Sequence, residues 1–191
     1  MVPTLQTERL ILQPISVDDA PQVQAIFPQW EIVRYLTNQV PWPYPPDGAL
    51  SFYREVAIPA MERGDAWHWT VRLKTAPNRI IGTIGLTRGE TNRGFWLDPA
   101  FQRQGLMLEA SDCVTDFWFD VLEMPVMRVP KAVGNNGSRR ISEKQGMRMV
   151  AIEDRDYVSG RLPSEIWEIS REEWMSRRAK DRLGERKALR R

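Results

Sequence analysis

The sequence is poor in the side chains that mark disulfides and metal sites. Its 191 residues include one cysteine, Cys113, and one histidine, His68. A single cysteine excludes an internal disulfide, and this pair supplies too few ligands for a Cys/His zinc site, so we expect no metal and a reducing compartment. No run of 18 apolar residues occurs, and Glu8 and Arg9 precede any apolar stretch, which argues against a membrane span or secretion signal. These absences predict a cytoplasmic location.

Several glycine motifs of common enzymes are also absent. The chain has no Gly-x-Gly, no Gly-Lys pair and no Gly-x-Ser-x-Gly. It therefore lacks the dinucleotide fingerprint, the P-loop and the nucleophile elbow of hydrolases. A Ser-His-Asp hydrolase would rest wholly on His68, which we interpret as a packed or solvated strand residue. Cys113 falls inside a predicted helix, and we interpret it as a small core residue because no second histidine is there to activate it.

The composition is otherwise that of an ordinary globular domain. Hydrophobic residues make up 42% and charged residues 27%, and a chain of this length can bury a core as one domain. The net charge is +2, but residues 171–191 hold nine Lys or Arg against four Asp or Glu, a local +5 that leaves about −3 for the rest. We therefore expect a domain over residues 1–174 and a basic helical tail over 175–191. A solvated helix is the simpler interpretation of the tail, with RNA, ribosome or membrane contact as the alternative.

Hydrophobic periodicity and turn residues predict a mixed fold. Strands are expected at 7–14, 66–72, 80–86, 93–97, 126–133, 147–157 and 162–170, and helices at 16–27, 47–63, 106–121 and 136–145. This order, with a strand–helix–strand–helix unit in the middle, indicates an α+β (α/β-like) class. Four prolines exclude regular helix from the aromatic segment 40–46, which either walls a pocket or covers the core.

A glycine-containing segment joins the strand at 93–97 to the long helix. It reads Gln102-Arg103-Gln104-Gly105-Leu106. The start of a helix offers unpaired N–H groups and a partial positive charge, so a pyrophosphate can dock there. Gly105 would let the backbone approach the anion closely, and Arg103 adds a full positive charge. A simple turn before a helix would look similar.

A second motif strengthens this interpretation. It begins with Asn135-Asn136-Gly137-Ser138 and ends with the segment 143–147, Glu-Lys-Gln-Gly-Met. With both motifs in this order, the sequence resembles the GCN5-related N-acetyltransferase (GNAT) superfamily, and within it the ribosomal-protein (RimJ/RimL-type) subgroup. The resemblance covers nearly the whole chain, with further matches at 7–10, 81–85, 94–97 and 109–110.

The resemblance implies a GNAT fold with acetyl-CoA as co-substrate. Such a fold has a mixed, mostly antiparallel sheet of six to seven strands, flanked by helices and splayed where two central strands diverge. Acetyl-CoA lies in the gap between those strands. The family's pyrophosphate-binding pattern maps onto 102–107, where Met107 stands in place of Gly or Ala. The cofactor-binding residues implied are Leu97, Gln102, Arg103, Gln104, Gly105, Leu106, Met107, Leu108, Asn135 and Ser138.

The activity implied is transfer of an acetyl group to a primary amine, on a protein N-terminus or a small molecule, by direct attack in a ternary complex. The resemblance suggests that a backbone N–H near Leu97 polarises the thioester carbonyl. Ser138, next to Asn135, would position or protonate the sulfur, and Tyr157 is a second possible acid. Relatives often carry a glutamate at the position of Asn92, so the nearest carboxylate, Glu90, or a water is expected as the base.

Two other functions remain open from the sequence. One is a protein that binds acyl-CoA without transferring the acyl group, and the other is a ribosome- or RNA-associated module that uses the basic tail. We expect a small-molecule or peptide amine as partner, and neither a membrane nor a nucleic acid. A homodimer is left open.

Overall fold

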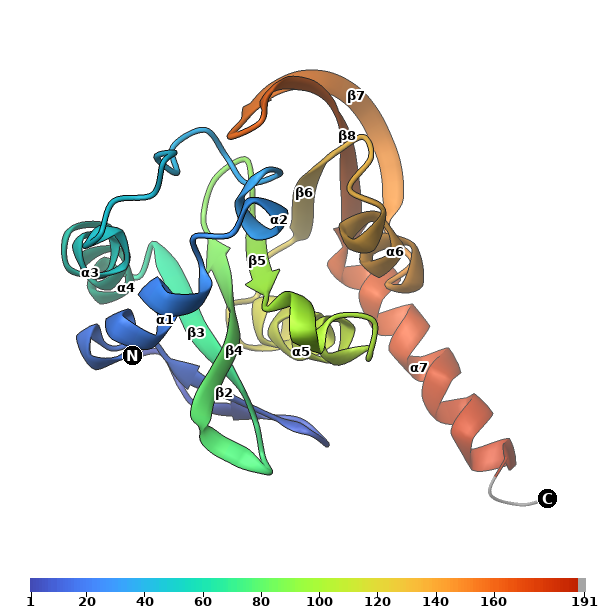
Figure 1. The fold of residues 1–191 in the computed structure, drawn as a ribbon. Coiled ribbons are helices and arrows are strands. Elements are labelled where there is room, and N and C mark those ends of the chain that lie inside the picture. The colour runs from blue at the N-terminus through green and yellow to red at the C-terminus, as the bar shows by residue number, and fades with distance from the viewer. Residues whose placement is uncertain (189–191) are drawn as a thin grey trace.

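Two antiparallel sheets form the framework of the protein (Figure 1). The structure is a computed structural model that describes residues 1–188, with side chains described for residues 1–180. The first sheet has its strands in chain order: β1 (Leu5–Gln6), β2 (Leu10–Pro14), β3 (Ala66–Leu73), β4 (Ala76–Thr87) and β5 (Arg93–Leu97). The second has the order β6 (Val126–Ala132), β8 (Gly160–Ser170), β7 (Arg148–Tyr157). The α+β class is as predicted, and the eight strands exceed the six to seven expected.

The helical elements lie between and around these strands. Before β3 come η1 (Val17–Asp19), α1 (Ala20–Ile26), α2 (Trp30–Val33), α3 (Gly48–Phe52), the π-helical η2 (Tyr53–Ala57) and α4 (Ile58–Arg63). After β5 come η3 (Pro99–Phe101), α5 (Leu106–Asp116), the π-helical η4 (Phe117–Val121), α6 (Asn136–Lys144) and α7 (Arg171–Ala188). In Figure 1, α1, α3 and α4 gather beside the five-stranded sheet, and α6 and α7 lie beside the second sheet.

Strand alternation gives the five-stranded sheet two apolar faces. One face packs against α5 and η4, where the fully buried Trp69 meets the ring of Phe117 edge-on at a centroid distance of 5.5 Å. The other face packs against α1, α3 and η2, and there Trp96 of β5 meets Phe27 at 5.4 Å. Because β5 is covered on both faces, only its edge can face a ligand.

The N-terminal strand is interrupted where the sequence predicts one strand over 7–14. The Thr7 hydroxyl accepts a hydrogen bond from the Leu10 N–H at 2.9 Å, and the Thr7 N–H donates to the Leu10 carbonyl at 3.0 Å. These local bonds close a tight turn between β1 and β2, which a period-two pattern does not reveal.

The helix predicted over 47–63 contains a π-helical turn. Pro59, near the start of α4, has no N–H and cannot donate to the carbonyl of Glu55 four residues earlier. The backbone around that position winds as η2 instead of continuing the α-helix. Such a change of winding does not alter which face carries the apolar residues, and so the amphipathic pattern still predicts the element.

Helix α7 crosses the boundary expected between residues 174 and 175. Ser170 and Glu173 form a reciprocal cap at its start, with bonds of 3.2 and 2.8 Å. Trp174 is only 2% exposed, and its indole N–H donates to Asp116 of α5 at 2.8 Å. Arg178 pairs with Asp120 at 2.6 Å. The first turns of α7 are therefore packed on the domain, and the division into 1–174 and 175–191 cuts a continuous helix.

Candidate active site

Asn92, just before β5, fastens the two sheets to each other. Its main-chain N–H donates to the Arg128 carbonyl of β6 at 2.9 Å, and its side-chain Oδ1 accepts from the Arg128 N–H at 2.7 Å. Its Nδ2 donates to the carbonyls of Gly89 and Thr87, at 2.9 and 3.3 Å. The amide is 5% exposed and all its polar groups are used, so Asn92 acts as a clamp between β5 and β6.

Beyond this clamp β5 and β6 separate, since in the described part of the chain they belong to different sheets with no shared ladder. The Asp98 N–H donates to the Ile81 carbonyl of β4 at 2.8 Å. Because alternate residues of an antiparallel strand direct their polar groups to opposite edges, the N–H groups of Phe95 and Leu97 point away from β4, toward β6. A gap thus lies between the two sheets, and main-chain N–H groups of β5 face it. One of them belongs to Leu97, which the sequence analysis assigned to cofactor binding.

The backbone after β5 turns sharply before α5. Arg103 and Gly105 both lie in the left-handed region, with φ of 63° and 77°. Gly105 is the N-cap of α5, and no side chain of the described residues caps it. The first amides of α5 are therefore available to an anion from outside the chain.

An ion pair ties this turn to the N-terminal strands. Arg9 contacts Glu109 of α5 through its guanidinium at 2.6 Å and its N–H at 2.8 Å, and it donates to the Gln104 carbonyl at 2.9 Å. Thr7 also donates to Glu109. Partial burial of Glu109 raises its pKa, but the hydrogen bonds from Thr7 and Arg9 and the charge of Arg9 leave the pKa below its usual value. A charged Glu109 holds the segment in place.

The side chains of the predicted cofactor segment divide between core and surface. Leu106 and Met107 are buried in the main core, 2% and 7% exposed, whereas Arg103 and Gln104 are exposed. Gln102 donates through Nε2 to the Leu97 carbonyl at 3.2 Å. Met107 therefore points into the protein and leaves the anion-facing side of the turn to the backbone.

Asn135 and Ser138 come together at the start of α6. Asn135 is the N-cap, and its Oδ1 accepts from the Ser138 N–H at 3.2 Å. The Asn-x-x-Ser spacing is thus the spacing of a helix cap. The cap orients the Ser138 hydroxyl, which accepts a hydrogen bond from Nζ of Lys131 at 2.8 Å.

Lys131 of β6 is a residue that the sequence did not single out. It is 4% exposed, and its ammonium lies 5.5 Å from the centre of the Phe95 ring of β5. Phe95 and Lys131 each lie three residues after the clamp, so the long lysine side chain reaches across the gap. Lys131 lies on the same face of β6 as the buried Met127 and Val129. This strand register was the signal in the sequence that could have indicated its burial.

Tyr157 and Glu90, the second possible acid and the expected base, contact groups other than Ser138. Tyr157 is buried at the end of β7, and its hydroxyl lies 2.5 Å from Ser164 of β8. Burial raises the pKa of Tyr157. Glu90 is exposed in the turn before the clamp, beside Arg128 and Glu168. No contact among the described side chains joins Glu90 to Ser138, and its role as base stays a prediction.

Neither His68 nor Cys113 lies in the gap. His68 packs against Gly85 and Phe52, and burial lowers its pKa to about 4. Burial first, then the nearby carboxylates of α5, raise the pKa of Cys113 to about 11, which suits an inert thiol. Among the described residues no group of three or more His, Cys, Asp or Glu is placed to hold a metal ion.

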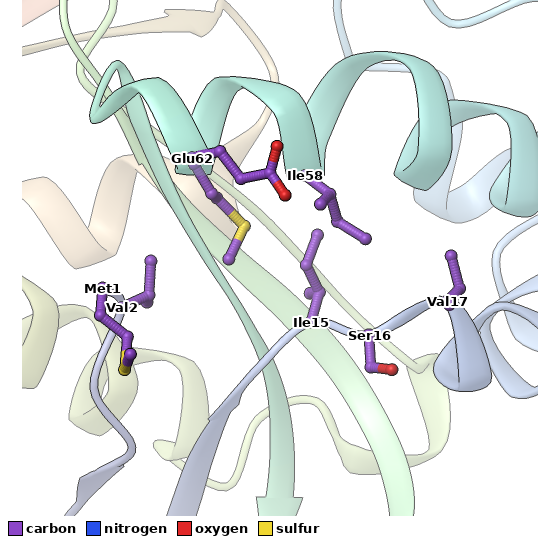
Figure 2. Close-up of a pocket in the computed structure, with 8 residues that line it drawn as sticks. Met1, Val2, Ile15, Ser16, Val17, Ile58 and Glu62 are labelled. Atoms are coloured by element: carbon purple, nitrogen blue, oxygen red, sulfur yellow. The ribbon is translucent and has the colours of Figure 1, made fainter.

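A hollow also lies elsewhere on the molecule. Figure 2 shows it between the N-terminal segment, the end of β2 and helix α4, with apolar side chains such as Ile15 and Ile58 in its wall. Its volume is about 520 Å³, and it opens widely to solvent. The helix start in its wall, that of η1, is already capped by the Ser16 side chain, and no Lys or Arg among the residues described lines the hollow, so we place the candidate site at the gap. Over the described part of the chain, no helix has the length and apolar content needed to cross a membrane.

Known proteins are similar to this chain in sequence and in fold. A family model described as acetyltransferase (GNAT) domain matches residues 9–148. A curated protein of Bacillus subtilis (strain 168), named "Probable N-acetyltransferase YjcK", is 30% identical over 98 residues, 48% of this chain. The match spans about half, 54%, of that relative's length.

Solved structures give the same result for the fold. The ribosomal-protein-S5-alanine acetyltransferase of Vibrio fischeri has a TM-score of 0.75 at 16% identity, over 90% of this chain and 98% of that one. The ribosomal L7/L12 α-N-protein acetyltransferase RimL, in complex with coenzyme A, has a TM-score of 0.74 at 14% identity, over 88% and 98%. The fold is therefore the GNAT fold. Since the family model covers most of its length, the chain belongs to the GNAT acetyltransferase family, and its structural neighbours include the predicted ribosomal-protein subgroup.

Proposed function

We propose that the protein transfers the acetyl group of acetyl-CoA to a primary amine, as an N-acetyltransferase with a ternary complex. The observation that carries this is the uncapped start of α5, with Gly105 in the left-handed region, at the open side of the gap between β5 and β6. Family membership and a relative solved with coenzyme A support it.

The chain's own groups match the needs of such a transfer. The amides of residues 105–108 would bind the pyrophosphate, with Gln102, Arg103 and Gln104 beside them. The Leu97 N–H would donate to the carbonyl oxygen of the thioester, where negative charge develops. Ser138, held by the Asn135 cap, would meet the sulfur. The base would be Glu90 or a water molecule.

The acceptor we propose is a protein N-terminus or a small-molecule amine. The names of two structural neighbours refer to ribosomal proteins, which supports an N-terminal peptide. The segment 40–46 is the part of the chain that we expect to help select it. Its Trp42 is 42% exposed and lies tilted against Trp30 at a centroid distance of 5.6 Å.

A screen of thiol release from acetyl-CoA tests the proposal. The full chain would be incubated with N-terminal peptides, polyamines and amino acids, with acetyl-CoA alone as the control. We expect release of one CoA thiol per acetylated amine, confirmed by a mass increase of the acceptor. Absence of coenzyme A binding in calorimetry would contradict the proposal altogether.

A non-catalytic acyl-CoA-binding protein is the second candidate. The observation that favours it is the full use of Asn92 as a clamp, at the position where relatives often carry a glutamate, together with the exposed place of Glu90. Tight binding of acetyl-CoA without thiol release for any acceptor would support this candidate against the first.

A further inference from the structure

Lys131 is a buried amine, and no carboxylate among the described residues forms a hydrogen bond or ion pair with it. Its Nζ bonds to Ser138 at 2.8 Å and faces the Phe95 ring. Glu165 of β8 is the nearby acid, but Arg139 occupies one of its oxygens at 3.1 Å and Trp167 the other at 3.0 Å. A buried charge without its own partner destabilises the folded state, so a lysine here needs another reason than stability.

The charges around Lys131 make its proton easy to release. From β5, Arg93 faces it as a second buried cation, and from β8, Glu165 attracts it. Burial first, and Arg93 next, hold the pKa of Lys131 well below its ordinary value, while Glu165 acts in the opposite direction. Arg93 is bonded to Thr115 of α5 at 2.8 Å, with Asp112 of the same helix nearby. α6 contributes Ser138.

We propose that Lys131 supplies, through the hydroxyl of Ser138, the proton that the departing CoA thiolate takes up. The inference rests on the proposed acetyl transfer and names the proton source of that site. It is carried by the 2.8 Å bond and by the reach of Lys131 across the gap toward β5. Lys131 acts through Ser138 and is therefore a positioning residue.

The step balances as follows. The acceptor nitrogen forms a bond to the acetyl carbon, and the C–S bond breaks with its electron pair on sulfur. The sulfur takes the Ser138 proton, Ser138 takes one from the Lys131 ammonium, and neutral Lys131 remains. The acetylated nitrogen loses its extra proton to the base, and solvent returns a proton to Lys131.

Side-chain chemistry explains why lysine suits this position. A serine hydroxyl alone is a weak acid, and an arginine in the same place stays charged and cannot pass its proton on. A lysine with a lowered pKa holds its proton less tightly than an ordinary lysine and can pass it on. Lys131→Arg is therefore expected to fail in the same way as Lys131→Met.

Steady-state kinetics over a pH series test the inference. In Lys131→Met we expect kcat to fall about 100-fold with KM for acetyl-CoA within about threefold, because proton transfer contributes to rate and not to binding. The wild-type kcat should decline at alkaline pH as the ammonium is lost, and this decline should be absent in Lys131→Met. The matched control is the exposed lysine variant Lys74→Met, with unchanged kcat.

A second measurement keeps the inference falsifiable if Lys131→Met folds poorly. In the wild-type protein with 15N-labelled lysine, the Lys131 amine should titrate well below the other lysines, and Ser138→Ala should shift that titration. An ordinary lysine titration, or a folded Lys131→Met with wild-type kcat and alkaline limb, would overturn the inference alone. A wild-type protein that acetylates no amine would instead overturn the proposed function.

Discussion

The imidazole of His68 lies in a space that only glycine leaves open. A Cβ at Gly85 would come within 2.2 Å of its Nδ1, and Phe52 meets the ring edge-on at 6.2 Å. From the sequence, His68 could be either a packed or a solvated strand residue. The structure shows that it is packed. Burial lowers the pKa of His68 to about 4, so the ring is neutral when folded at neutral pH.

This histidine should make stability depend on pH. Because its folded pKa lies below its unfolded value of about 6.5, the unfolded state takes up a proton first as the pH falls, and stability is lost from about pH 6.5 downward. Between pH 7 and pH 5 we expect the free energy of unfolding to drop by about 2 kcal/mol in urea denaturation. In His68→Phe this drop should largely vanish, and an equal drop in the variant would rule out the ring as its source.

Gly105 offers a test of the anion site at the scale of one residue. Gly105→Val should weaken coenzyme A binding by at least about tenfold, because a branched side chain strains a left-handed backbone and would stand where the pyrophosphate docks. Calorimetry on folded protein measures this. Gly64→Val is the matched control, since Gly64 has a φ of 76° against 77°; a Cβ at Gly64 would meet nothing within 4 Å, and one at Gly105 would make only an ordinary contact with Arg9 at 3.5 Å. Equal loss of affinity in both variants would point to a general folding defect.

Trp174 is a buried side chain through which helix α7 packs on the domain. Trp174 packs near Phe119 with a centroid distance of 6.4 Å and bonds to Asp116. Trp174→Ala should cost about 3–5 kcal/mol of unfolding free energy. Thermal unfolding would then shift down by on the order of 10 °C. Met175→Ala, at a 41% exposed neighbour, should change stability by less than about 0.5 kcal/mol.

The same contact changes how an RNA-binding role of the tail should be tested. A truncation after Glu173 removes Trp174. A loss of RNA binding in that variant could then come from unfolding of the domain as well as from loss of the basic tail. A truncation after Lys180 keeps Trp174 and Arg178 and removes five Lys or Arg with two Asp or Glu. Salt-dependent RNA binding that is lost in this shorter truncation would favour the RNA-associated alternative.

At the scale of the whole molecule, patterns close along the chain predicted more than contacts between distant segments. The starts of α5 and α6, expected at 106 and 136, could be predicted because a helix start shows itself in glycine, asparagine and serine at fixed spacing. The clamp at Asn92 could not, because it depends on Arg128, 36 residues further on. For Lys131 the sequence carried only the strand register as a signal of burial, and the contacts with β5 and α6 are known from the structure alone.

The clamp also sets the mechanics of the gap. Since β5 and β6 are joined at Asn92 and Arg128 and unpaired beyond, a rotation of one strand about that point would move the far end of the gap most. Leu97 lies five residues away, about 16 Å along an extended strand, so a tilt of about 5° would move it by about 1.4 Å. A displacement of that size decides whether the Leu97 amide reaches a carbonyl oxygen. The position of the Asn92 side chain therefore affects the distance between the Leu97 N–H and a bound thioester, five residues away.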